Sequence, residues 1–266
     1  MAITALHTAA TGMQALSTKI DVIANNIANA DTPGFKASRA NFQDLLYQVW
    51  AQPGVQTSTE TASPLGTQIG LGVALSNTQI MFKQGSAIST GRTLDAMIEG
   101  DGLFQIELPG GGTGYTRAGN FIRNSEGELV LGNSQGVRLL DTPTIPEEIP
   151  DDKVSIGTDG TITASMPDGT IQVLGQIQLA RFANASALLQ MGSNIYLESP
   201  ASGEPIEGNP GEEGIGTIKG GHLELSTTEA VTELVELIKT QRVFQMNSQS
   251  IQSADEALRV VAGLRR

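Results

Sequence analysis

The two ends of the chain carry apolar residues at coiled-coil spacing, and an unrelated body separates them. Over the first thirty residues, two rows of side chains repeat every seven positions. The rows are Leu6, Met13, Ile20 and Ile27, and Ala9, Leu16, Ile23 and Ala30. Because such positions stay on one side of a helix, the spacing predicts an a/d seam along an N-terminal α-helix.

A second amphipathic pattern occupies the C-terminal end of the chain. Its apolar residues follow similar steps and are Ala230, Leu234, Leu237, Phe244, Ile251 and Leu258. Polar residues at Gln241, Ser248 and Asp255 interrupt this seam. The apolar seam of one such helix does not offset the conformational entropy lost when the helix orders. The pattern therefore predicts a subunit that assembles through its ends, with ends that order only in a polymer.

Turn and cap signals divide the chain into four parts. The first helix is expected from Thr4 to Ala30, before the breaker 31–34 (Asp-Thr-Pro-Gly). Residues 35–73 are expected to form an extended connector, and 52–67 are rich in Thr, Ser, Pro and Gly and so extended or loop-like. Residues 226–229 (Ser-Thr-Thr-Glu) fit a capping box, so residues 223–266 are expected to carry the closing helix.

The part between these ends, residues 74–222, is predicted to form an antiparallel β domain. Phe104, Ile106 and Leu108 alternate with polar residues, which predicts one buried face. Asp-Gly pairs at 159–160 and 168–169 predict two hairpin turns. The fold class is therefore α+β, with paired terminal helices at residues 1–34 and 223–266.

Composition and charge exclude several classes of function. The net charge of −12 and pI near 4.6 argue against a nucleic-acid or anionic-membrane surface. The chain has no cysteine, and no apolar run is long enough to span a bilayer. The first residues lack the basic and apolar regions of a secretory signal, so export without a cleaved signal peptide is expected.

No catalytic, cofactor or metal constellation stands out in the sequence. His7 and His222 are the only histidines, and neither has ligand spacing around it. The glycine run at 110–114 lacks the Lys-Ser/Thr of a phosphate loop, so it is interpreted as a hairpin loop. We expect no catalytic residues, no cofactor, no metal and no small-molecule substrate. A secreted β-rich enzyme with coiled-coil ends stays as a distant alternative.

Residues 24–36 carry the most specific motif. They read Ala-Asn-Asn-Ile-Ala-Asn-Ala-Asp-Thr-Pro-Gly-Phe-Lys, which resembles the Ala-Asn-Asn-Leu-Ala-Asn-x-x-Thr-x-Gly-Phe-Lys signature of bacterial flagellar rod and hook proteins. The matching positions are Asn25, Asn26, Asn29, Thr32, Gly34, Phe35 and Lys36. Further blocks agree in order at 42–48, 68–73, 84–85, 94–95, 100–104 and 115–121, and Gln241 and Arg242 match the closing helix. The resemblance covers essentially the whole chain.

Within that family, the region from Tyr47 to Pro64 resembles the distal-rod members. It contains Gln52, Pro53 and Gly54, followed by a Thr/Ser-rich stretch. Hook proteins lack this insertion, so it argues against the nearer alternative, which is a proximal rod subunit or a short hook protein. The resemblance implies a rod-stiffening role for this segment, bracing axial neighbours.

The family resemblance also implies the partners and the roles of the helices. The terminal helices would pair and line a central channel, and the β domain would form the outer wall of a helical homopolymer. Asn25 and Asn26 fall off the seam and are expected to make intersubunit hydrogen bonds, with plain solvent exposure as the alternative. The expected partners are copies of the chain itself, proximal rod proteins, the hook protein, the surrounding ring proteins and the flagellar export apparatus, at the basal body.

Overall fold

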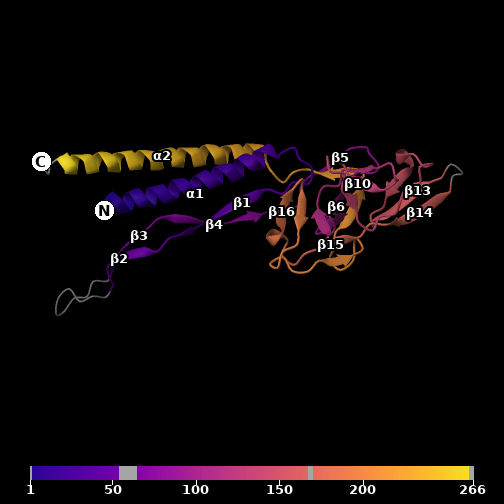
Figure 1. The fold of residues 1–266 in the computed structure, drawn as a ribbon, viewed down its shortest axis with the longest axis horizontal. Helices are drawn as coiled ribbons and strands as arrows, with labels where there is room; N and C mark the ends of the chain where they lie inside the picture. Colours follow the sequence, from indigo (N-terminus) through magenta and orange to yellow (C-terminus); the bar gives the residue numbers. More distant parts are fainter. Residues whose placement is uncertain (1, 54–64, 167–169, 264–266) are drawn as a thin grey trace. The chain divides into compact units, whose positions relative to one another are not determined.

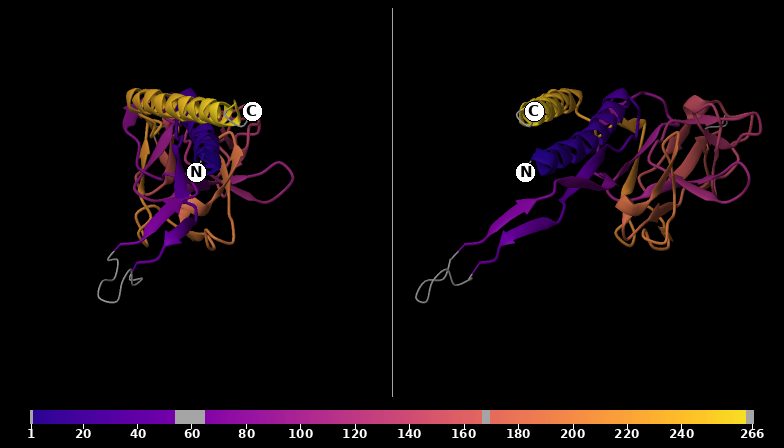
Figure 2. Two further views of the ribbon diagram at one scale, coloured as in Figure 1. Left: turned by 90° about the vertical axis from the view of Figure 1, so that its left-hand side faces the viewer. Right: turned by 60° about the vertical axis from the view of Figure 1, so that its left-hand side comes forward.

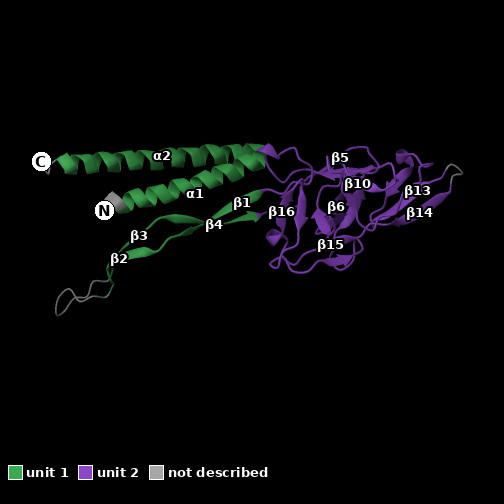
Figure 3. Ribbon diagram, viewed as in Figure 1, with its two compact units in different colours: residues 1–27, 38–79, 230–266 green, residues 28–37, 80–229 purple. Residues whose placement is uncertain are grey.

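The computed structural model describes residues 2–53, 65–166 and 170–263 and divides into two compact units (Figures 1 and 3). Unit 1 contains residues 1–27, 38–79 and 230–266, and unit 2 contains residues 28–37 and 80–229. Four chain passages therefore connect the units. The predicted helix–β–helix order agrees with the α+β class, although unit 1 also takes in most of the region expected as a connector.

Unit 1 is built from two long helices and a β-hairpin. Helix α1 spans Ala2–Ala28 and helix α2 spans Ala230–Gly263. Helix α1 ends two residues before the predicted Ala30, and a turn follows in which Thr32 N donates to the carbonyl of Asn29. Among the described residues, neither helix is long and apolar enough to cross a membrane.

The predicted start signal of α2, residues 226–229, lies directly before the helix. The Ser226 hydroxyl accepts a hydrogen bond from Thr228 N at 3.1 Å, before the helix starts at Ala230. The Thr227 hydroxyl accepts from Ala37 N at 2.9 Å. Tertiary hydrogen bonding therefore holds this segment, and α2 starts at Ala230, directly after it.

The remainder of unit 1 forms paired strands where a connector was expected. Strands β1 (Ser38–Asp44) and β4 (Val73–Ile80) pair, as do β2 (Tyr47–Ala51) and β3 (Thr67–Gly70). Leu45 N donates to Gly72 O and Leu71 N to Leu46 O, so the two pairs continue as one ribbon. Figure 2 shows this ribbon from two further sides. Residues 54–64, including Gly54 and Pro64, lie outside the described residues.

Unit 2 is an antiparallel β domain with a nine-stranded sheet. That sheet has the order β16-β17-β8-β7-β11-β10-β9, with β15 pairing β7 and β18. Its strands are β7 (Leu103–Glu107), β8 (Thr113–Thr116), β9 (Phe121–Arg123), β10 (Leu129–Leu131), β11 (Arg138–Leu139), β15 (Leu179–Arg181), β16 (Leu189–Gly192), β17 (Ile195–Leu197) and β18 (Ile206–Gly208).

Smaller sheets complete unit 2. The three-stranded sheet contains β12 (Val154–Ile156), β13 (Thr161–Ser165) and β14 (Ile171–Gln176). The pairs are β5 (Ala87–Ser89) with β20 (His222–Glu224), and β6 (Ala96–Glu99) with β19 (Thr217–Gly220). Two short 3-10 helices span Asp151–Lys153 and Ala185–Ala187. The pair at 159–160 does connect β12 to β13, and 168–169 lies outside the described residues.

The core of unit 2 lies on both faces of β7. Phe104 and Ile106 are fully buried in the larger apolar cluster, as their alternation predicts. Leu103 packs in a second cluster with Tyr115 and Tyr196 on the other face. Gln105 is also buried, so the expected single buried face was wrong. Because β7 pairs with β8, β11 and β15, it is an interior strand covered on both sides.

Candidate functional site

Most of the buried residues of α1 have small side chains or none. Ala9, Gly12, Ala15, Ile23 and Asn26 are buried. The other residues of the predicted seam in this part of the chain are only half-buried; they are Leu6, Met13, Leu16, Ile20, Ile27 and Ala30. One of the two predicted rows, the one that contains Ala9 and Ile23, therefore includes the more deeply buried positions.

Helix α2 places one stripe toward α1 and leaves another exposed. Leu237, Phe244 and Ile251 are half-buried, and Thr240 between them is buried. Lys19 donates to Glu236 Oε1 at 2.5 Å, and this ion pair joins the two helices. Leu234 and Leu258 of the predicted seam are instead exposed. The exposed apolar residues of α2 are Val231, Leu234, Val235, Ile238, Val243, Met246, Leu258 and Val260.

The two adjacent asparagines of the motif have different environments. Asn26 is buried; its amide donates to the carbonyl of Ser38 at 2.9 Å and accepts from Ser38 N at 3.0 Å. These bonds within one chain use the amide group for which intersubunit hydrogen bonds were expected, so that expectation is wrong for Asn26. Asn25 is exposed, as are Gln241 and Arg242 on α2. The role of Asn25 stays a prediction.

The motif continues from Asn29 into unit 2, where Gly34 is required by its surroundings. The Thr32 hydroxyl donates to Asn29 Oδ1 at 3.2 Å in the turn after α1. Gly34 has φ of +72°, and a Cβ there would lie 2.7 Å from Ala118 N. Its own N–H donates to Glu224 O at 2.8 Å. A side chain at Gly34 would therefore both strain the backbone and clash with the main chain of Arg117 and Ala118.

Lys36 belongs to a buried ionic cluster, which we define as Lys36, Arg117 and Glu224. Lys36 Nζ donates to Glu224 Oε1 at 2.7 Å, and Arg117 Nε donates to Glu224 Oε2 at 2.6 Å. All three side chains are at most 5 % exposed. The cluster joins the segment after α1, the end of β8 and the end of β20 within unit 2.

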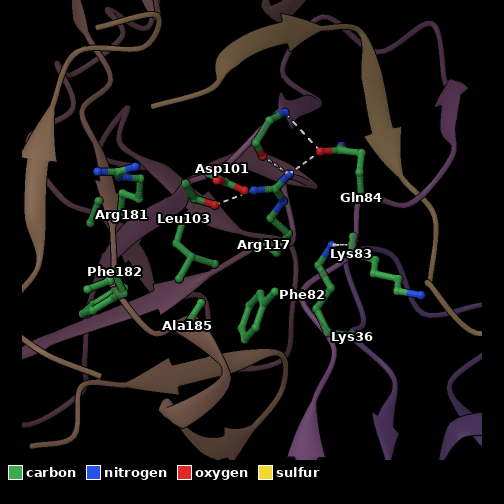
Figure 4. Close-up of a pocket in the computed structure, with 14 residues that line it drawn as sticks. Lys36, Phe82, Lys83, Gln84, Asp101, Leu103, Arg117, Arg181, Phe182 and Ala185 are labelled. Atoms are coloured by element: carbon green, nitrogen blue, oxygen red, sulfur yellow. Dashed lines mark hydrogen bonds between the residues drawn. The ribbon is translucent and has the colours of Figure 1, made fainter. Parts of the chain in front are cut away.

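Arg117 connects the cluster to the loop before β7. Its Nη2 donates to the carbonyls of Ile98 and Gly100 at 2.9 and 2.7 Å, and its Nη1 donates to that of Gly102. Nη2 also donates to Gln84 Oε1 at 2.9 Å, a contact that Figure 4 shows. The guanidinium thus donates to five acceptors, which belong to Gln84, Ile98, Gly100, Gly102 and Glu224.

Burial dominates the electrostatics of this cluster. It lowers the pKa of Lys36, and nearby Arg117 acts in the same direction, while Glu224 opposes the change. Burial also raises the pKa of Tyr196, with the Glu224 charge contributing. The cluster holds two cationic groups and one carboxylate, so Glu224 is the single acid that compensates both.

A cavity of about 350 Å³ adjoins the cluster (Figure 4). Phe82, Leu103 and Phe182 line it beside Arg117 and Arg181. The Lys36 ammonium and the Arg117 guanidinium already donate to internal acceptors, so neither is poised for acid–base or nucleophilic chemistry. Within the described ranges, no three His, Cys, Asp or Glu residues come together as a metal site.

The predicted rod-stiffening segment is exposed where the structure describes it. The side chain of Tyr47 is 54 % exposed on β2, and Gln52 and Pro53 are exposed at its end. Trp50 and Leu46 are further exposed apolar residues of the same ribbon. The described part of the segment therefore presents large apolar side chains at the surface of unit 1.

Sequence reasoning found part of the ionic cluster and missed its centre. Lys36, Gln84 and Arg117 all lie in motif blocks, but Glu224 does not. The available signal was a charged residue between two leucines at the end of a short strand, Leu223 and Leu225. That pattern also describes many surface strands, so it could not identify a buried carboxylate.

Comparison with known proteins agrees with the motif. Three family models match: "Flagella basal body rod protein" at residues 6–36, "Flagellar hook protein FlgE/F/G D1 domain" at 97–164, and "Flagellar basal body rod FlgEFG protein C-terminal" at 219–264. The flagellar basal-body rod protein FlgG of Borreliella burgdorferi is 40% identical over 98% of both chains. The chain belongs to the FlgG family of flagellar basal-body rod proteins.

Other FlgG relatives are similarly close. Those of Bacillus subtilis and Caulobacter vibrioides are each 41% identical over 98% of this chain. The matched region is 98% of the Bacillus subtilis protein and 99% of the Caulobacter vibrioides protein. The flagellar hook-basal body complex protein FlhP of Bacillus subtilis is 27% identical over 97% of this chain. The similarity to FlgG proteins therefore exceeds the similarity to this other axial protein.

Proposed function

We propose that the chain is a structural subunit of the flagellar distal rod, which polymerises into a rigid, hollow helical shaft. The relatives are named as rod proteins, and none of those compared above is named as an enzyme. The observation that carries the proposal is the row of exposed apolar side chains on α2, in a helix whose other stripe already faces α1. Such a second stripe is expected to be covered by neighbouring subunits.

In this proposal the terminal helices form a coiled-coil-like inner layer. Residues Leu6 to Ala30 and Leu234 to Leu258 would surround the channel, and unit 2 would form the outer wall. A contact that repeats from copy to copy without closing a ring produces a helical filament. The shaft would transmit torque from the motor and surround the path of exported subunits.

The β-ribbon of unit 1 is proposed to brace axial neighbours. Its exposed residues Tyr47, Val49 and Trp50 offer apolar surface that a monomer leaves in water. The segment from Gln52 to Pro64 would extend this contact. If assembled tubes stay straight and rigid after deletion of residues 52–64, the bracing role is wrong.

The proposed partners follow from a place in the rod. They are further copies of the chain, proximal rod proteins below, the hook protein above, the surrounding rings, and the export apparatus that delivers the subunit. The proposed location is the basal body of the flagellum.

Electron microscopy of the purified protein tests the function directly. We expect straight tubes with a hollow axis, at protein concentrations that allow polymerisation. A protein that remains a monodisperse monomer across protein and salt concentrations would contradict the proposal.

A further inference from the structure

The chain passages between the two units converge, within unit 2, on one buried side chain. The chain passes between the units after residues 27, 37, 79 and 229. On the unit 2 side, these passages lead into residues 28–37, the segment that starts at residue 80, and the segment that ends at residue 229. The third segment contains Glu224, and the other two are hydrogen-bonded to Glu224 or to a residue next to it.

The segment after α1 is bonded to the segment before α2. Gly34 N donates to Glu224 O at 2.8 Å, and Thr227 N donates to Phe35 O at 3.1 Å. Ala37 N donates to the Thr227 hydroxyl at 2.9 Å. Two stretches almost two hundred residues apart in sequence are thereby joined side by side.

The segment that follows β4 is bonded to the same place. Gly85 N donates to Glu224 Oε1 at 2.6 Å, and Leu225 N donates to Ser86 O at 2.9 Å. Lys36 Nζ donates to the carbonyl of Lys83 at 2.5 Å as well as to Glu224 Oε1. All the chain passages are thus linked to one another through Lys36 and Glu224.

The carboxylate also anchors these segments to the main sheet. Its second oxygen, Oε2, accepts from Arg117 Nε at 2.6 Å, and Arg117 donates in turn to the carbonyls of Ile98, Gly100 and Gly102. Glu224 is fully buried, and no other acid in the described residues bonds to Lys36 or Arg117. Removing its charge would leave two buried cations without a compensating carboxylate.

We propose that Glu224 is the positioning residue of a mechanical joint, which fixes the chain passages to the β domain and makes the subunit stiff. A load carried by the helices reaches unit 2 only through the chain passages and any contact between the units. A joint that holds the passages through one buried carboxylate loosens them together when that carboxylate is lost. If the cluster only stabilised the fold, loss of the carboxylate would instead lower the protection of backbone amides from hydrogen exchange evenly across the whole β domain.

The first experiment measures local opening in the full chain and does not depend on polymerisation. In Glu224→Gln, we expect backbone amides in 31–37 and 222–229 to exchange at least about tenfold faster, which corresponds to ~1.4 kcal/mol of lost local stability. Amides of β10 and β13 should change by less than about threefold. Glu107→Gln is the control, because Glu107 also pairs with an arginine, Arg138, but lies exposed.

A second variant covers the case in which Glu224→Gln does not fold. Lys36→Met keeps the Arg117–Glu224 pair and removes only the link to residues 83 and 224. A folded β domain is therefore expected, with selective loosening of 31–37. If neither variant changes local exchange relative to Glu107→Gln, or if both slow or quicken exchange uniformly across unit 2, the joint is contradicted.

The consequence for stiffness rests on the proposed function and is measured on tubes. Tubes of Lys36→Met or Glu224→Gln should bend more than wild-type tubes in electron micrographs, with a persistence length reduced several-fold. Equal stiffness in all tubes overturns the joint while leaving the rod assignment intact. Failure of the wild type to form tubes overturns the rod assignment, and the exchange experiment still decides the joint.

Discussion

Unit 2 encloses its apolar residues, whereas unit 1 leaves many of its own in water. Phe104, Ile106 and Phe121 are fully buried in unit 2. Among the described residues of unit 1, the buried apolar side chains are Ala9, Ala15 and Ile23, two of them the smallest available. The difference teaches that unit 2 has its own core, and that unit 1 has surface that further copies must cover.

The ionic contacts differ between the units in the same way. Lys36, Arg117 and Glu224 form a buried cluster in unit 2, where loss of one partner leaves uncompensated charge. The pair between Lys19 and Glu236 in unit 1 is partly exposed, with side chains 27 % and 40 % exposed. Solvent screens such a pair, so it contributes little to stability by itself.

The largest expected effect is loss of a core aromatic from unit 2. Phe104→Ala removes a fully buried ring that contacts Phe121 edge-to-face at 5.0 Å, so the free energy of unfolding should fall by about 3–5 kcal/mol. Urea unfolding followed by near-ultraviolet circular dichroism measures this change. Leu46→Ala in the exposed ribbon of unit 1 is the matched control and should shift stability by less than ~0.5 kcal/mol.

A charge in α1 separates assembly from folding. Ile23→Asp places a carboxylate at a buried position of unit 1, which costs several kcal/mol unless its pKa rises. We expect tube formation to be lost while the unfolding of unit 2 is unchanged. Ala24→Asp adds the same charge at the neighbouring exposed position and should still assemble. Normal tubes from Ile23→Asp would show that this side of α1 is not part of a dry interface.

Alkaline pH should weaken unit 2 through a buried phenol. Burial raises the pKa of Tyr115 to about 12, and the charges of Glu198 and Glu207 contribute. Below pH ~10 the phenol is protonated in both states; above it, the unfolded chain loses this proton first, so stability falls as the pH rises toward 12. The loss should reach about 2–3 kcal/mol, from ~1.4 kcal/mol per pKa unit. Denaturant titrations of Tyr115→Phe should show a shallower decline than wild type; identical declines would exclude Tyr115 as the cause.

The smallest effect is expected for the exposed pair of unit 1. The Lys19 ammonium lowers the pKa of Glu236, so this contribution is present near neutral pH and is lost as the pH falls through the lowered pKa. Glu236→Gln should weaken the assembled tube by only ~0.3–0.5 kcal/mol per subunit, and less in high salt. The urea midpoint of depolymerisation measures this change. If Glu236→Gln cost more free energy than Phe104→Ala, the exposed pair of unit 1 would matter more than the core of unit 2, which would contradict the contrast between the units.

The sequence predicted the elements better than the contacts between them. Residue periodicity and the breaker after Ala30 placed α1 within two residues of its observed ends, Ala2 and Ala28. The start signal at 226–229 directly precedes α2, but the tertiary hydrogen bonds of Thr227 with Phe35 and Ala37 were not predicted. Local signals compete with such contacts, and a sequence pattern does not reveal the competition.

The ionic cluster was beyond prediction for the same reason. Glu224 contacts Lys36 from 188 residues away, Gly85 from 139 and Arg117 from 107. No periodicity connects positions so far apart, and an isolated glutamate after a leucine is ordinarily solvated. Motif resemblance did identify Lys36 and Arg117 as notable, but only the fold brings them to one carboxylate.

Hydrogen exchange on the free subunit and on the assembled tube tests the central claim most directly. The account predicts that residues 1–30 and 230–266 exchange rapidly in a dilute monomer and become strongly protected in the polymer, whereas β7 and β10 are protected in both. Strong protection of both helices in a verified monomer, unchanged on assembly, would contradict the account.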